Sequence, residues 1–491
     1  MVMKVLCLGN NRKHTDELTS KLGNNHGLIS NLDIKVKEGF YHTSVLDLTN
    51  SEILELAKQF DRVIVLDQPV DNWNHPAEFH ATQDIAKRIG SKVSWQNTDG
   101  KFQLEYWQNL VSTNKSFCIF PFIELLTQNG HTTVCCRSDK PVQSIDKLDN
   151  FATDEEYQKI RRSMLAGEGL PEHCQFCYKL EDKGIISARQ EETVEWAMRL
   201  DLKNIDDLGT IVEPVYYEVR PSNTCNLMCR MCDPMFSSLI EKEQKQLGKI
   251  PQEYTEKYSN FDIVKIENVV KLYVAGGEPT AMPEFYDFLR KCARRKYTNF
   301  EFIVNTNGMK VSTLLLELGK HFKNLQYIIS IDGYKKHNDY ARWRSKWETI
   351  VENTHKLKDN GHKIHFNTVL SLWTIFDYHQ LIHFLDTEFP DCTIHGQYEG
   401  RYTPFVFEYS QDQIQNLESI RTTKVYHNNS MFQSFIDGTI HSAKQSFVNK
   451  KAITKFFKYN DELDKARTSR LNDYIPMLEQ LRMHVDKSGD L

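Results

Sequence analysis

Hydrophobic residues occur in short continuous runs near the beginning of the chain. Lys4–Leu8 and Arg62–Leu66 are such runs, and they are typical of strands buried on both faces of a parallel sheet. A helix is predicted over Ile53–Phe60, and Lys92–Trp95 is a further candidate strand. Residues 1–110 are therefore predicted to form a small α/β domain of the Rossmann type.

This first region lacks the glycine-rich phosphate loop of dinucleotide-binding domains. Gly9 is followed by Asn10 and Asn11, which does not fit the G-x-G-x-x-G pattern. We therefore expect a structural or substrate-recruiting role for this domain, not cofactor binding.

Strand-like and helix-like patterns alternate through residues 201–400. The expected strands are Val215–Val219, Lys271–Val274, Phe300–Val304, Tyr327–Ser330, Lys363–Val369 and Thr393–Tyr398. One helix has marked ends, because Ser345-Lys346-Trp347-Glu348 forms a capping box and Asn360-Gly361 is a stop signal. Strands with intervening helices predict a parallel, partly closed barrel, in which the chemistry gathers at the C-terminal strand ends.

The last region, residues 401–491, is highly charged and predicted to be mostly helical. Apolar positions near helical spacing occur over Phe456–Leu471 and Tyr474–His484, with a break expected at Pro476. We interpret this region as a helical cap packed on the barrel.

The composition is that of an ordinary globular protein. The chain has 491 residues, with 40% hydrophobic and 26% charged residues. Its formal net charge of -5 gives no electrostatic argument for a general nucleic-acid binder. No apolar run reaches the ~20 residues needed to span a bilayer. The residues after Met1 also lack the apolar core and cleavage site of a signal peptide. A cytoplasmic protein without a membrane partner is expected.

The cysteines are clustered along the chain. There are 11, an odd number without a secretion signal, which argues against a disulfide framework. Nine of them fall between Cys118 and Cys292, mostly in tight groups. This clustering indicates metal ligation in a reducing compartment. Cys292 itself lies in a helical pattern and is expected to be simply buried.

The tightest group follows the first expected barrel strand and reads Cys225-Asn226-Leu227-Met228-Cys229-Arg230-Met231-Cys232. An iron–sulfur cubane normally takes four thiolates. Three thiolates hold three corners and leave the fourth iron open to an exchangeable ligand. The alternative is a zinc knuckle, but zinc usually needs a fourth Cys or His at matching spacing, and none follows nearby.

With its C-x3-C-x2-C spacing, this loop resembles the signature of the radical SAM superfamily. The resemblance implies a partial (β/α)6 barrel and a [4Fe-4S] cluster held by Cys225, Cys229 and Cys232. It implies that the open iron chelates the amino and carboxylate groups of S-adenosylmethionine (SAM). Reductive cleavage of SAM would then give a 5′-deoxyadenosyl radical, which takes a hydrogen atom from a substrate. Met231 stands where the family often has an aromatic residue.

Further motifs of this resemblance lie at the predicted strand ends. Gly276-Gly277-Glu278-Pro279 matches the family's GGEP motif, which is implied to bind the methionine amino group. Four polar residues after the next two strands are implied to contact the ribose and carboxylate of SAM: Asn305, Asn307, Ser330 and Asp332. Taken singly, Asn-Gly and Asp-Gly would indicate only turns. Arg342 is expected to pair with the SAM carboxylate, with Arg344 as the competing residue.

A second cysteine set lies in residues 111–200. A hairpin is predicted around Gly130, and a helix is predicted over Asp154–Ala166. The cysteines are placed around these elements and are Cys118, the adjacent pair Cys135-Cys136, and Cys174-x2-Cys177. With Glu181, Ser187 and Arg189 they resemble the SPASM or twitch modules that accompany many radical SAM enzymes, although here the module precedes the core.

This second set supplies enough thiolates for a second [4Fe-4S] cluster, with Cys118, Cys136, Cys174 and Cys177 as the expected ligands. Cys136 is preferred to Cys135 because successive side chains on a strand point to opposite faces. Zinc is the competing ion, since four thiolates would also hold it well.

Together these observations predict an α/β enzyme of the radical SAM type. Its regions are a small α/β domain (1–110), a cysteine-rich SPASM/twitch-like module (111–200), a radical SAM barrel (201–400) and a helical C-terminal region (401–491). The resemblance favours a peptide or protein side chain as substrate and an electron donor such as a flavodoxin or ferredoxin as partner.

Modification of RNA or a nucleotide is the alternative, and it would need a basic channel with stacking aromatic residues. A zinc-stapled interaction protein without catalysis is a third reading, and it predicts a colourless protein where the radical SAM reading predicts a brown one.

Overall fold

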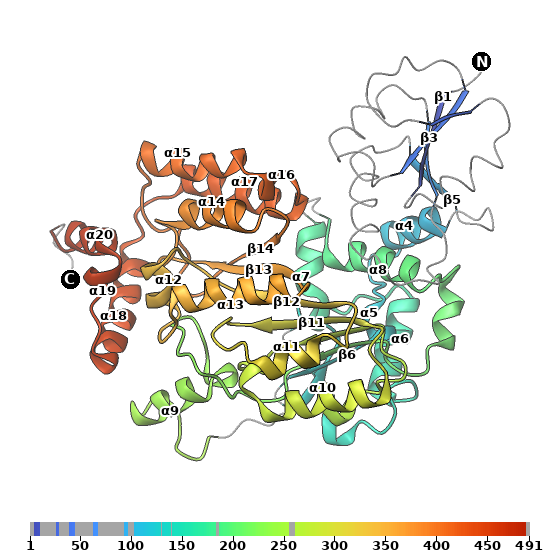
Figure 1. The fold of residues 1–491 in the computed structure, drawn as a ribbon, viewed down its shortest axis with the longest axis horizontal. Coiled ribbons are helices and arrows are strands. Elements are labelled where there is room, and N and C mark those ends of the chain that lie inside the picture. Colours follow the sequence, from blue (N-terminus) through green and yellow to red (C-terminus); the bar gives the residue numbers. More distant parts are fainter. Residues whose placement is uncertain are drawn as a thin grey trace. The chain divides into compact units, whose positions relative to one another are not determined.

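In the computed structural model the chain divides into two compact units (Figure 1). The first comprises Met1–Leu126 with His131–Tyr216, and the second Thr127–Gly130 with Tyr217–Leu491. The structure describes residues 4–9, 26–28, 39–44, 62–66, 93–96, 103–128, 130–138, 140–182, 186–254 and 261–487. The helix predicted over Ile53–Phe60 lies outside the described residues.

A parallel sheet of five strands opens the first unit. The strands are β1 (Lys4–Gly9), β2 (His26–Leu28), β3 (Gly39–Ser44), β4 (Arg62–Leu66) and β5 (Val93–Gln96). Their order is β2-β3-β1-β4-β5, so the chain builds outward from β1 on both sides. This doubly wound order confirms the predicted α/β class. Strands β1, β4 and β5 were predicted from the sequence. Strands β2 and β3 are less apolar and were not predicted.

The rest of the first unit is built from short strands and helices. They are α4 (Gln103–Thr113), α5 (Phe120–Ile123), β7 (His131–Thr133), β8 (Pro141–Ser144), α6 (Glu155–Leu165), α7 (Pro171–Glu181) and α8 (Ala188–Arg199). The division between the units falls within the neighbouring strand β6 (Glu124–Gln128). The helix predicted over Asp154–Ala166 is α6, whose amino end is capped by the Asp154 carboxylate accepting from the Tyr157 amide at 3.0 Å. Trp107, Tyr157 and Trp196 are fully buried in the core of this unit.

Six strands of the second unit lie in sequence order in one sheet that does not close into a barrel. They are β9 (Tyr216–Val219), β10 (Lys271–Val274), β11 (Glu301–Thr306), β12 (Leu325–Ser330), β13 (Lys363–Leu370) and β14 (Thr393–Tyr398). The pairs from β10 to β14 are parallel. All six strands and the partly closed barrel are therefore confirmed, and their carboxyl ends share one edge of the sheet.

Helices connect these strands. They are α9 (Ser238–Gln246), α10 (Pro283–Arg295), α11 (Thr313–Gly319), α12 (Lys336–Ala341), α13 (Trp347–Asp359) and α14 (Tyr378–Glu388). The predicted stop of α13 is confirmed, since Gly361 has a positive φ of 84° directly after the helix. The predicted capping box is wrong, because the N-cap is Lys346. The Ser345 hydroxyl instead donates to Asp339 at 2.8 Å. Cys292 is buried in α10, as expected.

The C-terminal region is helical, which confirms its prediction. Its helices are α15 (Gln411–Ser419), α16 (Lys424–His427), α17 (Ser430–Gln445), α18 (Lys450–Arg467), α19 (Leu471–Tyr474) and α20 (Pro476–Lys487). In Figure 1, α15 and α16 lie beside α14, and α17 packs against α15, α16 and β14. The break expected at Pro476 is confirmed, since α19 ends at Tyr474 and Pro476 opens α20. Proline is tolerated there because the first helical turn needs no hydrogen bond from the amide that proline lacks. Over the described ranges, no helix has the length and apolar character required to cross a membrane.

Candidate cofactor-binding sites

The loop with three cysteines follows β9, and the segment after α12 holds it in place. The Met228 amide donates to the Trp343 carbonyl at 2.9 Å, and the Arg230 amide donates to the Ala341 carbonyl at 2.7 Å. The backbone on both sides of Cys229 is therefore fixed to one short stretch of chain.

The three thiols of this loop are electrostatic neighbours. Burial, followed by the neighbouring Cys229, raises the pKa of Cys225 to about 12. Burial and the other two thiols raise the pKa of Cys232 well above its ordinary value. The pKa of Cys229 is also raised by burial. The three predicted ligands are therefore close enough to influence one another, and each thiol would have to lose its proton to bind iron.

Arg342 faces these thiols. Its Nη1 lies 3.2 Å from Oδ2 of Asp332, a fully buried carboxylate whose Oδ1 accepts from the Val369 amide at 2.9 Å. Burial alone would lower the pKa of Arg342, but Asp332 and the three thiols raise it above its ordinary value. The buried Nε of Arg342 has no hydrogen-bond partner among the described residues. Arg344 is exposed, so the structure favours Arg342 over its competitor.

The GGEP motif packs against the loop that precedes the cysteines. The Gly277 amide donates to the Ser222 carbonyl at 2.9 Å, and the Glu278 amide donates to the Thr224 carbonyl at 2.7 Å. A Cβ on Gly277 would lie 2.2 Å from the Thr224 carbonyl oxygen. The glycine is therefore required by a close approach of the protein's own backbone.

Glu278 is not available to a ligand in this structure. Its side chain is 0% exposed. Its carboxylate accepts from the Thr280 amide at 3.0 Å, the Thr280 hydroxyl at 2.6 Å, the Thr306 hydroxyl at 2.7 Å and the Asn307 amide at 2.6 Å. Three of these donors bind Oε1 and one binds Oε2, so the carboxylate fixes the end of β11. Because the side chain is also buried, the structure favours a supporting role for Glu278 over the expected contact with the methionine amine. Pro279 is buried at the start of the next short turn.

The other predicted polar residues lie along the carboxyl edge of the sheet. The Ser330 hydroxyl donates to Asn305 Oδ1 at 2.9 Å, and Asn305 Nδ2 donates to the Tyr273 hydroxyl at 3.1 Å. Asn307 Nδ2 donates to Asn226 Oδ1 in the cysteine loop at 2.7 Å. The polar edge therefore carries two hydrogen-bonded groups, and the one that contains Asn307 reaches the cysteine loop.

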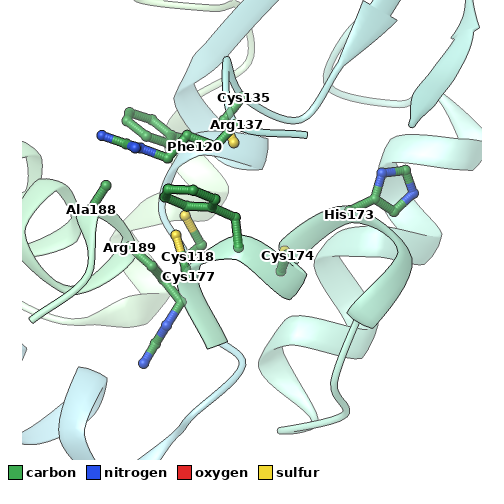
Figure 2. A pocket seen from close by; sticks show the side chains of 10 residues that line it. Cys118, Phe120, Cys135, Arg137, His173, Cys174, Cys177, Ala188 and Arg189 are labelled. Atoms are coloured by element: carbon green, nitrogen blue, oxygen red, sulfur yellow. The ribbon is translucent and has the colours of Figure 1, made fainter. Parts of the chain in front are cut away.

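The second cysteine set lines a pocket in the first unit (Figure 2). The thiols come from the loop before α5, the turn after β7 and the helix α7. The lining residues are Cys118, Cys135, Cys174 and Cys177 together with Phe120, Arg137, His173, Phe176, Ala188 and Arg189. Burial raises the pKa of Cys118, and the neighbouring Cys174 and Cys177 raise it further. The pKa of Cys174 is raised to about 11, mainly by burial.

The adjacent cysteine pair shows the choice of Cys136 to be wrong. Cys135 lines the pocket, whereas Cys136 is exposed and does not. The reason is that β7 ends at Thr133, so the pair lies in a turn, where the Ser138 amide donates to the Cys135 carbonyl at 3.2 Å. The alternation of side chains along a strand does not apply there.

Arg189 holds the elements around the pocket together. It makes an ion pair with Glu181 of α7 through Nε at 2.9 Å and Nη2 at 2.7 Å. Its Nη1 also donates to the Phe117 carbonyl at 2.6 Å, next to Cys118. Ser187, also quoted in the resemblance, donates to Glu181 at 2.5 Å. These polar residues therefore fix the helix that carries Cys174 and Cys177.

Both donor sets suit an iron–sulfur cluster. Within the part of the chain that the structure describes, no three or more His, Cys, Asp or Glu side chains are arranged around one point as ligands of a single metal ion. In a cubane each thiolate binds a different iron atom, so its thiols need not converge on one point. One set of three partly exposed thiols beside a cation and one pocket with four thiols fit such clusters.

Sequence reasoning missed several charged residues around the three-cysteine loop. Arg230, inside the loop, is fully buried. Arg401 donates to Asp233 Oδ1 at 3.0 Å and also to the Met231 carbonyl, on either side of Cys232. The partners of both arginines are far away in the sequence, and only the charge within an otherwise apolar motif could have drawn attention to Arg230.

Comparison with known proteins agrees with the geometry of the second unit. Residues 219–385 match the model of the radical SAM superfamily. No curated protein matches the chain significantly.

Solved structures give weaker similarities. SuiB of Streptococcus suis bound to the precursor peptide SuiA is 14% identical, over 56% of this chain and 61% of that chain, with a TM-score of 0.32. The protein anSMEcpe with bound AdoMet is 16% identical, over 48% of this chain and 62% of that chain, with a TM-score of 0.31. The methyltransferase TsrM of Kitasatospora setae is 9% identical, over 82% of this chain and 77% of that chain, with a TM-score of 0.28.

These TM-scores are too low to support an argument, and the chain spans less than two thirds of the length of SuiB and of anSMEcpe. The family assignment rests on the matched residues, which run from the end of β9 through α14 and include the cysteine loop, the GGEP motif and Arg342. The chain therefore contains a domain of the radical SAM superfamily of enzymes.

Proposed function

We propose that this chain is a radical SAM enzyme whose catalytic [4Fe-4S] cluster is held by Cys225, Cys229 and Cys232. The observation that carries the proposal is the set of three neighbouring thiols facing Arg342. When bound there, a reduced cluster supplies the electron that cleaves SAM to methionine and a 5′-deoxyadenosyl radical. Three protein ligands leave the fourth iron to SAM.

Arg342 is proposed to bind the SAM carboxylate. Its Nη1 is oriented by Asp332, while its buried Nε has no partner among the described side chains and backbone groups. A buried donor without a partner costs free energy, and a carboxylate from the ligand would satisfy it.

Asn305 and Ser330 are proposed to contact the ribose, since they form the hydrogen-bonded edge beside the cysteine loop. Gly276, Gly277 and Pro279 contribute through backbone shape. Glu278, Asn307 and Asp332 support neighbouring groups and do not touch SAM through their carboxylates or amide.

The second pocket is proposed to hold a further [4Fe-4S] cluster through Cys118, Cys135, Cys174 and Cys177. Four thiolates would close every corner of the cubane, so this cluster would relay electrons or support the fold. Zinc is the competing ion for the same thiolates.

For the substrate we propose a peptide or protein side chain, from which the radical abstracts a hydrogen atom. The likeness of the second cysteine set to SPASM/twitch modules supports this class. A flavodoxin or ferredoxin would supply the electron, and a reducing cytoplasm would keep the thiols available.

The test is SAM cleavage by anaerobically reconstituted protein with a strong reductant, measured as 5′-deoxyadenosine. Cys229→Ala should abolish product formation, because one lost thiolate disrupts a site that has only three. Cys292→Ala, which removes a buried helical thiol elsewhere in the same unit, is the matched control and should remain active. A wild type that never cleaves SAM, or a fully active Cys229 variant, would refute the proposal.

A further inference from the structure

Helix α18 of the C-terminal region is hydrogen bonded to the cysteine loop through Arg230. This arginine is fully buried between the second and third cysteines. Its Nη2 donates to Asp464 Oδ1 at 2.5 Å and its Nη1 donates to Asn460 Oδ1 at 3.2 Å, and both partners belong to α18. The hydroxyl of Tyr459, also on α18, donates to the Arg230 carbonyl at 2.8 Å.

The ion pair of Arg230 with Asp464 is tightly enclosed. The guanidinium lies 3.6 Å from the centre of the Tyr340 ring, and the Tyr340 hydroxyl donates to Asp464 at 2.9 Å. Ser469 donates to the same carboxylate oxygen at 2.7 Å. Because the site excludes water, removal of the Asp464 charge would leave a buried cation without compensation.

A second side chain of α18 reaches the same loop. Arg467 Nη1 donates to the Met228 carbonyl at 2.9 Å. Its Nε and Nη2 pair with both oxygens of Glu243 on α9, each at 2.8 Å. This paired geometry fixes the guanidinium, and through it the backbone on the other side of Cys229.

The two residues of the cysteine loop that α18 contacts are also hydrogen bonded to the segment around Arg342. Met228 and Arg230, which flank Cys229, are hydrogen bonded through their amides to Trp343 and Ala341, which flank Arg342. A shift of residues 228–230 would therefore move Cys229 relative to Arg342.

We propose that Asp464 and Arg467 of α18 are positioning residues that fix the position of Cys229 relative to Arg342. They contact neither cluster nor SAM and act through residues 228–230. The inference rests on the proposed function, because it assigns a role to α18 in the catalytic cluster of that site. Groups that orient metal ligands typically change metal affinity by about 10- to 100-fold when removed.

The test uses Asp464→Asn and Arg467→Met in the full chain, with Asp461→Asn as the matched control. Asp461 is on the same helix but pairs with Arg482 of α20 at 2.5 Å and is 54% exposed. The catalytic cluster is observed as the electron paramagnetic resonance signal that is absent from the variant with Cys225, Cys229 and Cys232 all changed to Ala. Its rate of loss to an iron chelator and its response to SAM are then measured.

We expect about 10-fold faster loss of this cluster and an altered SAM response in both α18 variants, with circular dichroism and the signal of Asp461→Asn as in the wild type. A purely structural contact would change thermal stability without changing the spectrum. If Asp464→Asn does not fold, Tyr459→Phe takes its place in the test. This substitution removes one hydrogen bond to the Arg230 carbonyl and should produce the same changes at a smaller size.

Two negative outcomes are distinguishable. Wild-type protein without a SAM-responsive signal would refute the proposed function and this inference with it. A normal wild-type signal with wild-type chelation rates and spectra in the α18 variants would overturn the inference and leave the proposed function standing.

Discussion

The two cysteine sets place their thiols in contrasting ways. In the first set three thiols come from one loop of eight residues, beside Arg342 and the buried Asp332. In the second set four thiols come from three separate segments and line one pocket. Beside the first set, Nε of Arg342 has no hydrogen-bond partner among the described residues. The loop of this set supplies three thiols, one fewer than the pocket of the second set. This difference supports the proposal that the first site binds an exchangeable ligand and the second is closed by protein ligands.

The largest expected effect separates the two sets directly. Changing Cys225, Cys229 and Cys232 together to Ala should abolish SAM cleavage and leave about four iron atoms per chain, with matching sulfide. Metal and sulfide analysis of the purified variant measures this. About one zinc per chain would instead mean that the second set is a structural zinc site. A variant without metal would show that the second set is merely buried, and the comparison would fail.

A smaller effect concerns the fourth ligand of the second set. In the background of the triple variant, Cys135→Ala should remove most of the remaining iron, because Cys135 lines the pocket. Cys136→Ala should retain it, because this neighbouring side chain is exposed. Iron content and the visible absorption of the two variants give the answer. Loss of iron in the Cys136 variant alone would reverse the assignment.

The smallest expected effect tests the cation that distinguishes the first set. Arg342→Gln should weaken SAM binding by about 10- to 100-fold while the cluster remains, since a hydrogen bond to a charged group contributes about 1.5–3 kcal/mol. Arg344→Gln is the matched control, because Arg344 is exposed two residues away. Titration of the cluster signal with SAM measures both. Equal affinity in the wild type and the Arg342 variant would contradict the assigned role.

The strands of the barrel could be predicted because their signal is local. All six lie within a few residues of their expected bounds, and α6 lies within the range predicted for it. Runs of buried residues and capping side chains depend on neighbours in the sequence. The cysteine loop was identified for the same reason, since its ligands are contiguous.

The errors in the site share another cause, which is competition between partners. Ser345 does not cap α13 because the N-cap position falls on Lys346, and Asp339 accepts from the Trp347 amide at 3.3 Å. Glu278 supports the end of β11 because it is buried and its carboxylate accepts from two threonines and from the Asn307 amide. Cys135 lines the pocket because the chain leaves its strand two residues earlier. None of these partnerships is visible from spacing along the chain.

The ion pair between Arg230 and Asp464 joins residues 234 positions apart, and this separation sets an order of events during synthesis. At about 5–20 residues per second, a ribosome needs roughly 10–50 s to travel from the cysteine loop to its partner on α18. Throughout that interval a nascent chain displays a complete C-x3-C-x2-C motif whose buried arginine still lacks its counter-ion. Stable loading of the catalytic iron is therefore expected only after α18 has been made. Fragments that end before α18 should carry the full signature of the superfamily and still hold their iron poorly.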